Sequence, residues 1–147
     1  PLSRSSAASD VYKRQGGSTI AYSPDGINWQ NGNSSSHRFS EAFGIAYSER
    51  LKLWVAVGTG INTICTSYDA IDWTGQGDGV FGSGGIIRGI HYNGYRFIAT
   101  GQGSVTIAYS EDGFTWTGAT NSTNIFSTTG WNGGMSNQYG CRHANQA

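Results

Sequence analysis

Short apolar stretches rich in β-branched and aromatic residues alternate with polar, glycine-rich turns along most of the chain. In the middle of the chain this pattern predicts four strands, at about 43–48, 52–58, 62–67 and 71–75. Turn signals separate them, such as Glu49-Arg50 and Gly58-Thr59-Gly60, and the next hairpin carries the turn dipeptide Asn93-Gly94. No window spaces its apolar residues as an amphipathic helix does. The pattern therefore predicts strands and turns, and no helix.

One hairpin, which we call the Ser–Asp–Trp hairpin, recurs three times along the chain. Its matched residues are Ser23, Asp25, Gly26 and Trp29, then Ser67, Asp69, Ala70 and Trp73, then Ser110, Asp112, Gly113 and Trp116. Two further pairs of segments, Gly44–Tyr47 with Gly89–Tyr92 and Trp54–Gly58 with Phe97–Gly101, repeat at a similar spacing. A period of about 40–45 residues without a helical pattern is typical of β-propellers. We therefore predict an all-β fold, an open partial β-propeller of about 2.5 four-stranded antiparallel blades.

The residues of this hairpin suit a structural role. The aspartate can accept hydrogen bonds from the backbone N–H groups just ahead of it, and the glycine allows a left-handed backbone. The tryptophan is expected on the fourth strand, buried between blades. A catalytic residue need occur only once, whereas these recur in every unit, so we interpret them as scaffold rather than as acid–base or metal-binding groups. Ala70, which replaces glycine, predicts a strained or differently shaped second turn.

Composition and charge exclude several classes of function. The 147-residue chain has a net charge of zero, and only 12% of its residues are charged. No basic patch is evident, so we expect no nucleic-acid partner, and no apolar run is long enough to predict a membrane span. Cys65 matches alanines in the neighbouring units, so it is interpreted as a small buried thiol. The histidines lie in unlike contexts, and we predict neither a metal site nor a cofactor.

The three Ser–Asp–Trp hairpins resemble the Asp-box, or BNR, repeat of sialidase-type β-propellers. The resemblance covers residues 18–118, and more weakly 119–133, with one residue fewer than usual between aspartate and tryptophan. The same repeat occurs in photosystem II assembly factors, sortilin-type receptors and some xyloglucanases, and similar repeats occur in environmental and viral reading frames of unassigned function. The resemblance implies that the hairpin is a structural turn at the blade periphery, away from the central pocket.

A sialidase resemblance would also imply three arginines that hold a carboxylate, a Tyr–Glu nucleophile pair and an aspartic acid. Only Arg88 lies at the start of a first strand, where the central pocket of a propeller could be lined. His91 takes a strand position that Ala46 holds in the preceding unit, and it is interpreted either as a ligand contact or as a structural strand histidine. Arg88 and His91 are therefore the two ligand candidates.

We see no paired carboxylates in a common setting, which predicts a non-catalytic structural or interaction module rather than an enzyme. One alternative is part of a sialidase-like or xyloglucanase-like glycoside hydrolase whose catalytic residues lie outside this chain. Another is a propeller of the photosystem-assembly-factor or receptor type. The partner, protein or glycan, and the cellular location are not predicted.

Both ends of the chain depart from the repeat. Residues 1–15 resemble a translated adaptor or linker found at the ends of metagenomic reading frames, the alternative being a native disordered leader. Residues 16–133 are expected to form the propeller blades, and 134–147 an irregular tail. We expect a fragment of a larger protein that exposes two apolar blade faces and is weakly stable or self-associating.

Overall fold

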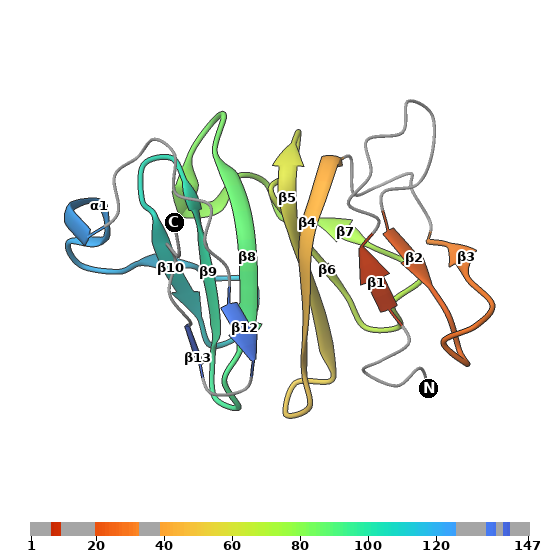
Figure 1. Cartoon of the computed structure of the whole chain (residues 1–147). Coiled ribbons are helices and arrows are strands. Elements are labelled where there is room, and N and C mark those ends of the chain that lie inside the picture. The colour runs from red at the N-terminus through yellow and green to blue at the C-terminus, as the bar shows by residue number, and fades with distance from the viewer. Residues whose placement is uncertain (1–6, 10–19, 33–38, 126–134, 138–139, 142–147) are drawn as a thin grey trace.

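Of the four antiparallel sheets in the computed structural model of the chain, three lie side by side, one for each Ser–Asp–Trp hairpin (Figure 1). The structure describes residues 7–9, 20–32, 39–125, 135–137 and 140–141. The prediction of an all-β fold is confirmed, and none of the sheets is closed on itself. Among the described residues, no helix is long and apolar enough to cross a membrane.

The middle sheet has four strands in sequence order: β4 (Phe39–Ser48), β5 (Leu53–Gly60), β6 (Ile64–Ser67) and β7 (Thr74–Gly75). These are the four strands predicted there, with two corrections. Residues 58–60, predicted as a turn, continue β5, because they pair with the early part of β4. The fourth strand is only two residues long and begins after Trp73, so this tryptophan precedes the strand instead of lying on it.

The third sheet repeats the middle one with β8 (Ile86–Tyr92), β9 (Phe97–Gln102), β10 (Ile107–Ser110) and β11 (Thr117–Gly118). A 3-10 turn, η2 (Gly79–Phe81), connects the two sheets, and a single helical turn, α1 (Ser122–Ile125), follows the third. The prediction of no helix was therefore wrong for four residues. Within the predicted irregular tail, β12 (Met135–Asn137) and β13 (Gly140–Cys141) form a two-stranded sheet.

The first sheet contains β1 (Ala7–Ser9), β2 (Ile20–Tyr22) and β3 (Gln30–Asn31). β1 lies within the segment that was predicted to be a foreign or disordered leader. It pairs with β2 so that Ala8 is opposite Ala21, just as Ala56 is opposite Cys65 in the middle sheet. These three residues thus take the place of a second strand, while the origin of the segment stays a prediction.

The first strand of each complete sheet contains a β-bulge at the matched position. In β4 the register shifts around Phe43, and in β8 it shifts around Arg88, at the matched position. Opposite these bulges the partner strands carry Gly58 and Gly101. A Cβ at either glycine would collide with backbone of the first strand, so both positions require glycine. The bulge and its glycine are therefore one repeated device that bends the first strand.

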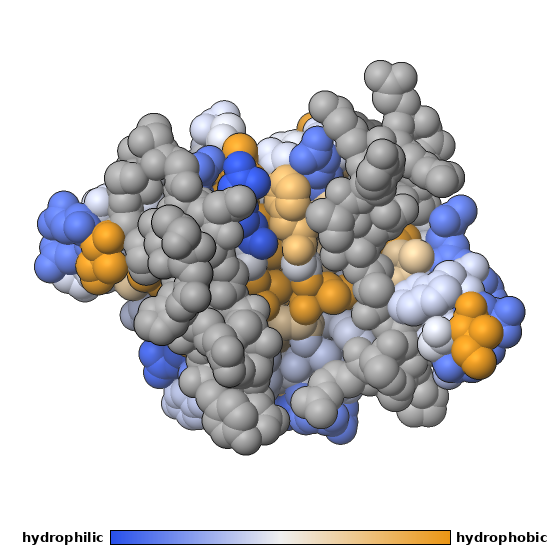
Figure 2. Space-filling view, in the orientation of Figure 1, coloured by the Kyte–Doolittle hydropathy of each residue, from blue (hydrophilic) through white to orange (hydrophobic). Residues whose placement is uncertain are grey.

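Two apolar clusters form the core, one on each side of the middle sheet. Alternate residues of β5 point to opposite faces. Val55 and Val57 join the cluster shared with the third sheet, and Trp54 and Ala56 join the cluster shared with β2. All five apolar residues from Leu53 to Val57 are buried, so the middle sheet is covered on both faces. Apolar surface also gathers at the centre of the view in Figure 2, where β4 and β8 lie side by side.

Candidate functional site

The three Ser–Asp–Trp hairpins have the same internal hydrogen bonds. In the middle unit, the Ser67 hydroxyl donates to Asp69 Oδ1 at 2.9 Å and accepts the Ala70 N–H at 2.9 Å. Asp69 Oδ1 also accepts the N–H groups of Ile71 and Asp72, each at 2.8 Å. The first and third hairpins repeat these bonds. The aspartates therefore close their own turns, as the sequence predicted.

Hydrogen bonding keeps these carboxylates ionised to low pH. At Asp25 the backbone N–H of Asn28 is the main cause that lowers the pKa below its ordinary value of 3.8. At Asp69 and Asp112, burial raises the pKa, and hydrogen bonds from the backbone and from the turn serine more than offset it, so that the pKa is again lowered. Such groups suit a structural role better than proton transfer near neutral pH.

Acid is expected to destabilise the chain through these turns. A carboxylate whose pKa is lower in the folded than in the unfolded chain stabilises the fold above its unfolded pKa, about 4, and that stabilisation is lost as pH falls through the folded pKa. For Asp69→Asn we expect about 1 kcal/mol lower stability at pH 7 and a smaller further loss between about pH 5 and pH 2 than in the wild type. Urea unfolding across this pH range measures both, and parallel pH profiles would contradict the expectation.

The left-handed position that follows each aspartate is the same in all three turns. Gly26 has φ 74°, Gly113 has φ 84°, and Ala70 has φ 63°. Of the two alternatives for the second turn, the structure shows the same shape with a strained alanine. A left-handed alanine costs about 1–2 kcal/mol. The buried Ala70 methyl lies in the cluster around Trp73, which offsets part of that cost.

Two of the three hairpin tryptophans, Trp73 and Trp116, pack their hairpin against the neighbouring sheet. The indole N–H of Trp73 donates to the Ala70 carbonyl at 3.1 Å, and that of Trp116 donates to the Gly113 carbonyl at 3.3 Å. Each indole belongs to one of the two clusters between sheets, which confirms the predicted burial. Trp29, the matched residue of the first unit, is exposed.

Arg88 and His91 both lie on β8 but do not form one site. Arg88 is the bulged residue, and its guanidinium lies over the ring of Phe43 at 5.4 Å, toward the middle sheet. His91 is paired with Ile98 on β9, so it lies on the face turned away from the middle sheet. Burial lowers the pKa of His91, which favours its neutral form. Arg88 Nε and His91 Nε2 have no hydrogen-bond partner among the described residues.

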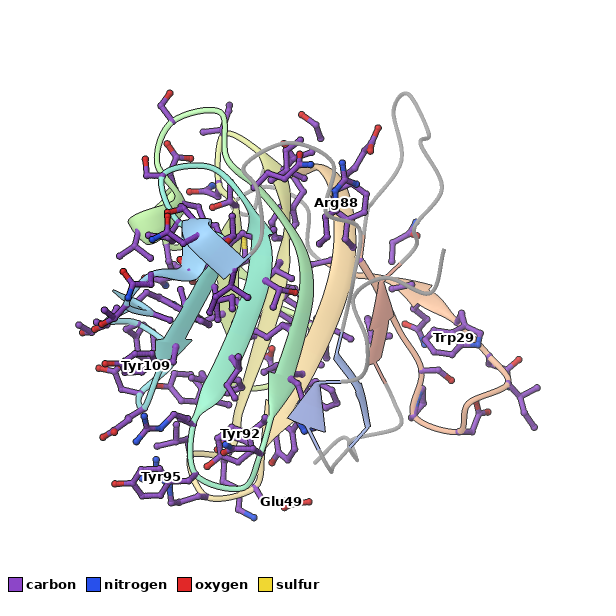
Figure 3. All side chains as sticks on the ribbon, turned by 60° about the vertical axis from the view of Figure 1, so that its left-hand side comes forward. Trp29, Glu49, Arg88, Tyr92, Tyr95 and Tyr109 are labelled. Atoms are coloured by element: carbon purple, nitrogen blue, oxygen red, sulfur yellow. The ribbon has the colours of Figure 1, made fainter. Side chains whose placement is uncertain are left out.

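An open groove of about 630 Å³ lies elsewhere, where the hairpin ends of the middle and third sheets meet. Arg50, which the sequence indicated only as a turn residue, links the two sheets. Its guanidinium donates to the carbonyl oxygens of Tyr95 at 3.2 Å and Glu111 at 2.9 Å and to the Tyr92 hydroxyl at 3.3 Å. Figure 3 shows Tyr92 and Tyr95 at this end of the molecule. The β4–β5 hairpin is two residues longer than the β8–β9 hairpin, which allows Arg50 to reach the third sheet.

Of the charged residues that line this groove, Arg50 bonds to the carbonyl oxygens, Asp112 bonds within its own turn, and Glu111 pairs with the neighbouring Arg96. Arg96 pairs with Glu111 at 3.1 Å, and its guanidinium lies 5.1 Å from the ring of Tyr109 and 5.2 Å from that of Tyr95. The hydrogen bonds of Arg50 therefore hold the two sheets together beside the groove, and the ring of Tyr95 stays exposed there. Among the described residues, no group of three histidine, cysteine or acidic side chains could hold a metal ion.

Comparisons of the chain with protein-family models, with curated proteins and with solved structures gave no match.

Proposed function

We propose that the chain is a non-catalytic β-propeller-type module, which serves as a structural or interaction scaffold. The observation that carries this proposal is the closed network of each Ser–Asp–Trp hairpin. The polar groups that recur in every unit bond to their own turn, and the indoles of Trp73 and Trp116 pack between sheets. In a repeat protein such residues define the unit, and binding falls to residues that do not recur.

The order of the sheets supports the propeller-type arrangement. The first strands β4 and β8 are neighbours, and each of the two complete sheets runs outward from its first strand. The same face of each complete sheet packs on the preceding sheet. An experimental structure in which successive units superpose by repeated rotation about one axis would support this proposal. Sheets related by unlike rotations would contradict it.

Arg88 is the observation that favours a second candidate, a glycan-processing module of the sialidase type. Arg88 Nε has no hydrogen-bond partner among the described residues, and a guanidinium beside an aromatic ring can donate hydrogen bonds to a carboxylate. We expect no hydrolysis of fluorogenic sialosides or of xyloglucan by the purified chain, and the same result for Arg88→Ala. Turnover by the wild type that Arg88→Ala abolishes would contradict the non-catalytic proposal and favour the second candidate.

A further inference from the structure

Among the described residues, no sheet covers the face of the first sheet that matches the covered faces of the middle and third sheets. Trp29 is 46% exposed, whereas the matched Trp73 and Trp116 are 1% and 8% exposed. A Cβ on Gly26 would meet nothing within 4 Å, whereas a Cβ on Gly113 would lie 2.6 Å from a methyl group of Leu53 in the preceding sheet. Figure 3 shows Trp29 at the edge of the molecule, away from the other sheets. We call this the tryptophan face.

The third sheet presents the complementary face, on the side away from the middle sheet. Ile98 and Ile107 hold the positions of Val55 and Ile64 in the middle sheet. Val55 and Ile64 are fully buried under the third sheet, whereas Ile98 and Ile107 are only half-buried. We call this the isoleucine face. Its apolar positions match those of the middle sheet that pack against Trp116.

The junction between the middle and third sheets shows how such faces fit together. Trp116 lies in one apolar cluster with Leu53, Val55, Val57 and Ile64 of the middle sheet. The tryptophan face and the isoleucine face are therefore the two halves of one further junction. They lie on opposite sides of the chain in Figure 1, because the first and third sheets flank the middle one. They can meet only between chains.

We propose that two copies of this chain associate head to tail, the tryptophan face of each on the isoleucine face of the other. This proposal rests on the propeller-type stacking proposed above. Three sheets from each copy give a ring within the range of about 4–8 blades that closed propellers use. Both junctions are then identical under one two-fold axis, so the assembly is closed and stops at two copies.

The new junction is more polar than those inside the chain, so it should be reversible. Arg96 stands where the middle sheet has Leu53. In the assembly Arg96 would face the turn of Gly26, as Leu53 faces that of Gly113. Its guanidinium then lies within reach of the exposed Trp29 ring, where a cation–π contact is favourable.

The experiment measures mass in solution by sedimentation equilibrium or light scattering. We expect the full chain to move from its monomer mass of 15.7 kDa to twice that mass as concentration rises. Trp29→Glu and Ile98→Glu should each abolish the dimer, because each spoils one half of both junctions. The matched control is Ile61→Glu, which removes an apolar side chain that is 67% exposed but lies in the β5–β6 turn, outside both faces. It should dimerise as the wild type does.

Mixing the two face variants gives the decisive result. A mixture of Trp29→Glu and Ile98→Glu chains can form one unaltered junction, so we expect a one-to-one heterodimer where each variant alone is monomeric. A dimer that mixing fails to restore, a ladder of larger species, or a wild type that stays monomeric would overturn the proposal. Near-UV circular dichroism separates the two proposals: monomers that keep packed tryptophans leave the proposed function standing.

Discussion

Replacing Gly101 with alanine is expected to destabilise the chain by about 3 kcal/mol or more, and Gly58→Ala is expected to do the same in the middle sheet. A Cβ at Gly101 would collide with the Ile86 carbonyl oxygen and lie 2.8 Å from Ile87 Cα. These atoms belong to the backbone of the neighbouring strand, so they cannot rotate away as the end of a side chain can. The added methyl group must therefore push β8 and β9 apart at the bulge.

The control for this prediction is the same substitution at a glycine that needs its backbone angle but not its space. Gly26 has φ 74°, and a Cβ there would meet no atom within 4 Å. Gly26→Ala is therefore expected to cost only the left-handed strain, about 1–2 kcal/mol. Urea unfolding followed by tryptophan fluorescence compares the three variants. Equal losses for Gly101→Ala and Gly26→Ala would mean that the bulge can accept a side chain.

The strands and the Ser–Asp–Trp hairpins could be predicted because their determinants are local. Each hydrogen bond of the turn joins residues two or three positions apart, so one short stretch of sequence contains the whole motif. Comparison of the three repeats then gave information that a single copy could not. The matched column of tryptophans predicted indoles buried between sheets, and Trp73 and Trp116 are buried there, although Trp73 precedes the fourth strand instead of lying on it.

The bulges could not be predicted, although their glycines recur. Gly58 and Gly101 were visible as a repeated pair, but a glycine near the end of a strand also signals a turn. The two roles differ in what lies opposite, which is a contact between strands and not a property of the local sequence. For the same reason the second turn glycine, Gly60, was placed in a turn although it pairs with Phe39 in the sheet.

The link made by Arg50 shows the same limit between sheets. Its three acceptors lie more than 40 positions away in the sequence. Neither Arg50 nor its acceptor Tyr95 recurs in the repeat, so no column marked them. The greater length of the β4–β5 hairpin was the one visible sign of this link. The direction in which that hairpin points depends on how the sheets pack, which the sequence does not give. The β1 strand was missed similarly, because a short Ala-Ala-Ser segment becomes a strand only through its partner β2.

A tryptophan-to-alanine series is expected to rank the three units by how well each is covered. Trp73→Ala and Trp116→Ala should each cost about 3–5 kcal/mol, because each leaves a large cavity between two sheets. Each also leaves the turn carbonyl without its indole N–H donor. Trp29→Ala should cost about 1 kcal/mol or less in dilute solution, because nearly half of that side chain is already exposed to water.

The series is measured by urea unfolding under dilute conditions and repeated at high concentration. If the tryptophan face docks on a second copy, the loss caused by Trp29→Ala must grow with concentration, because only the wild type gains stability from association. The losses at Trp73 and Trp116 come from junctions within one chain and should grow much less. If Trp29→Ala and Trp73→Ala cost the same stability in dilute solution, Trp29 must already be covered within the monomer. That result would contradict the proposed docking of the tryptophan face on a second copy.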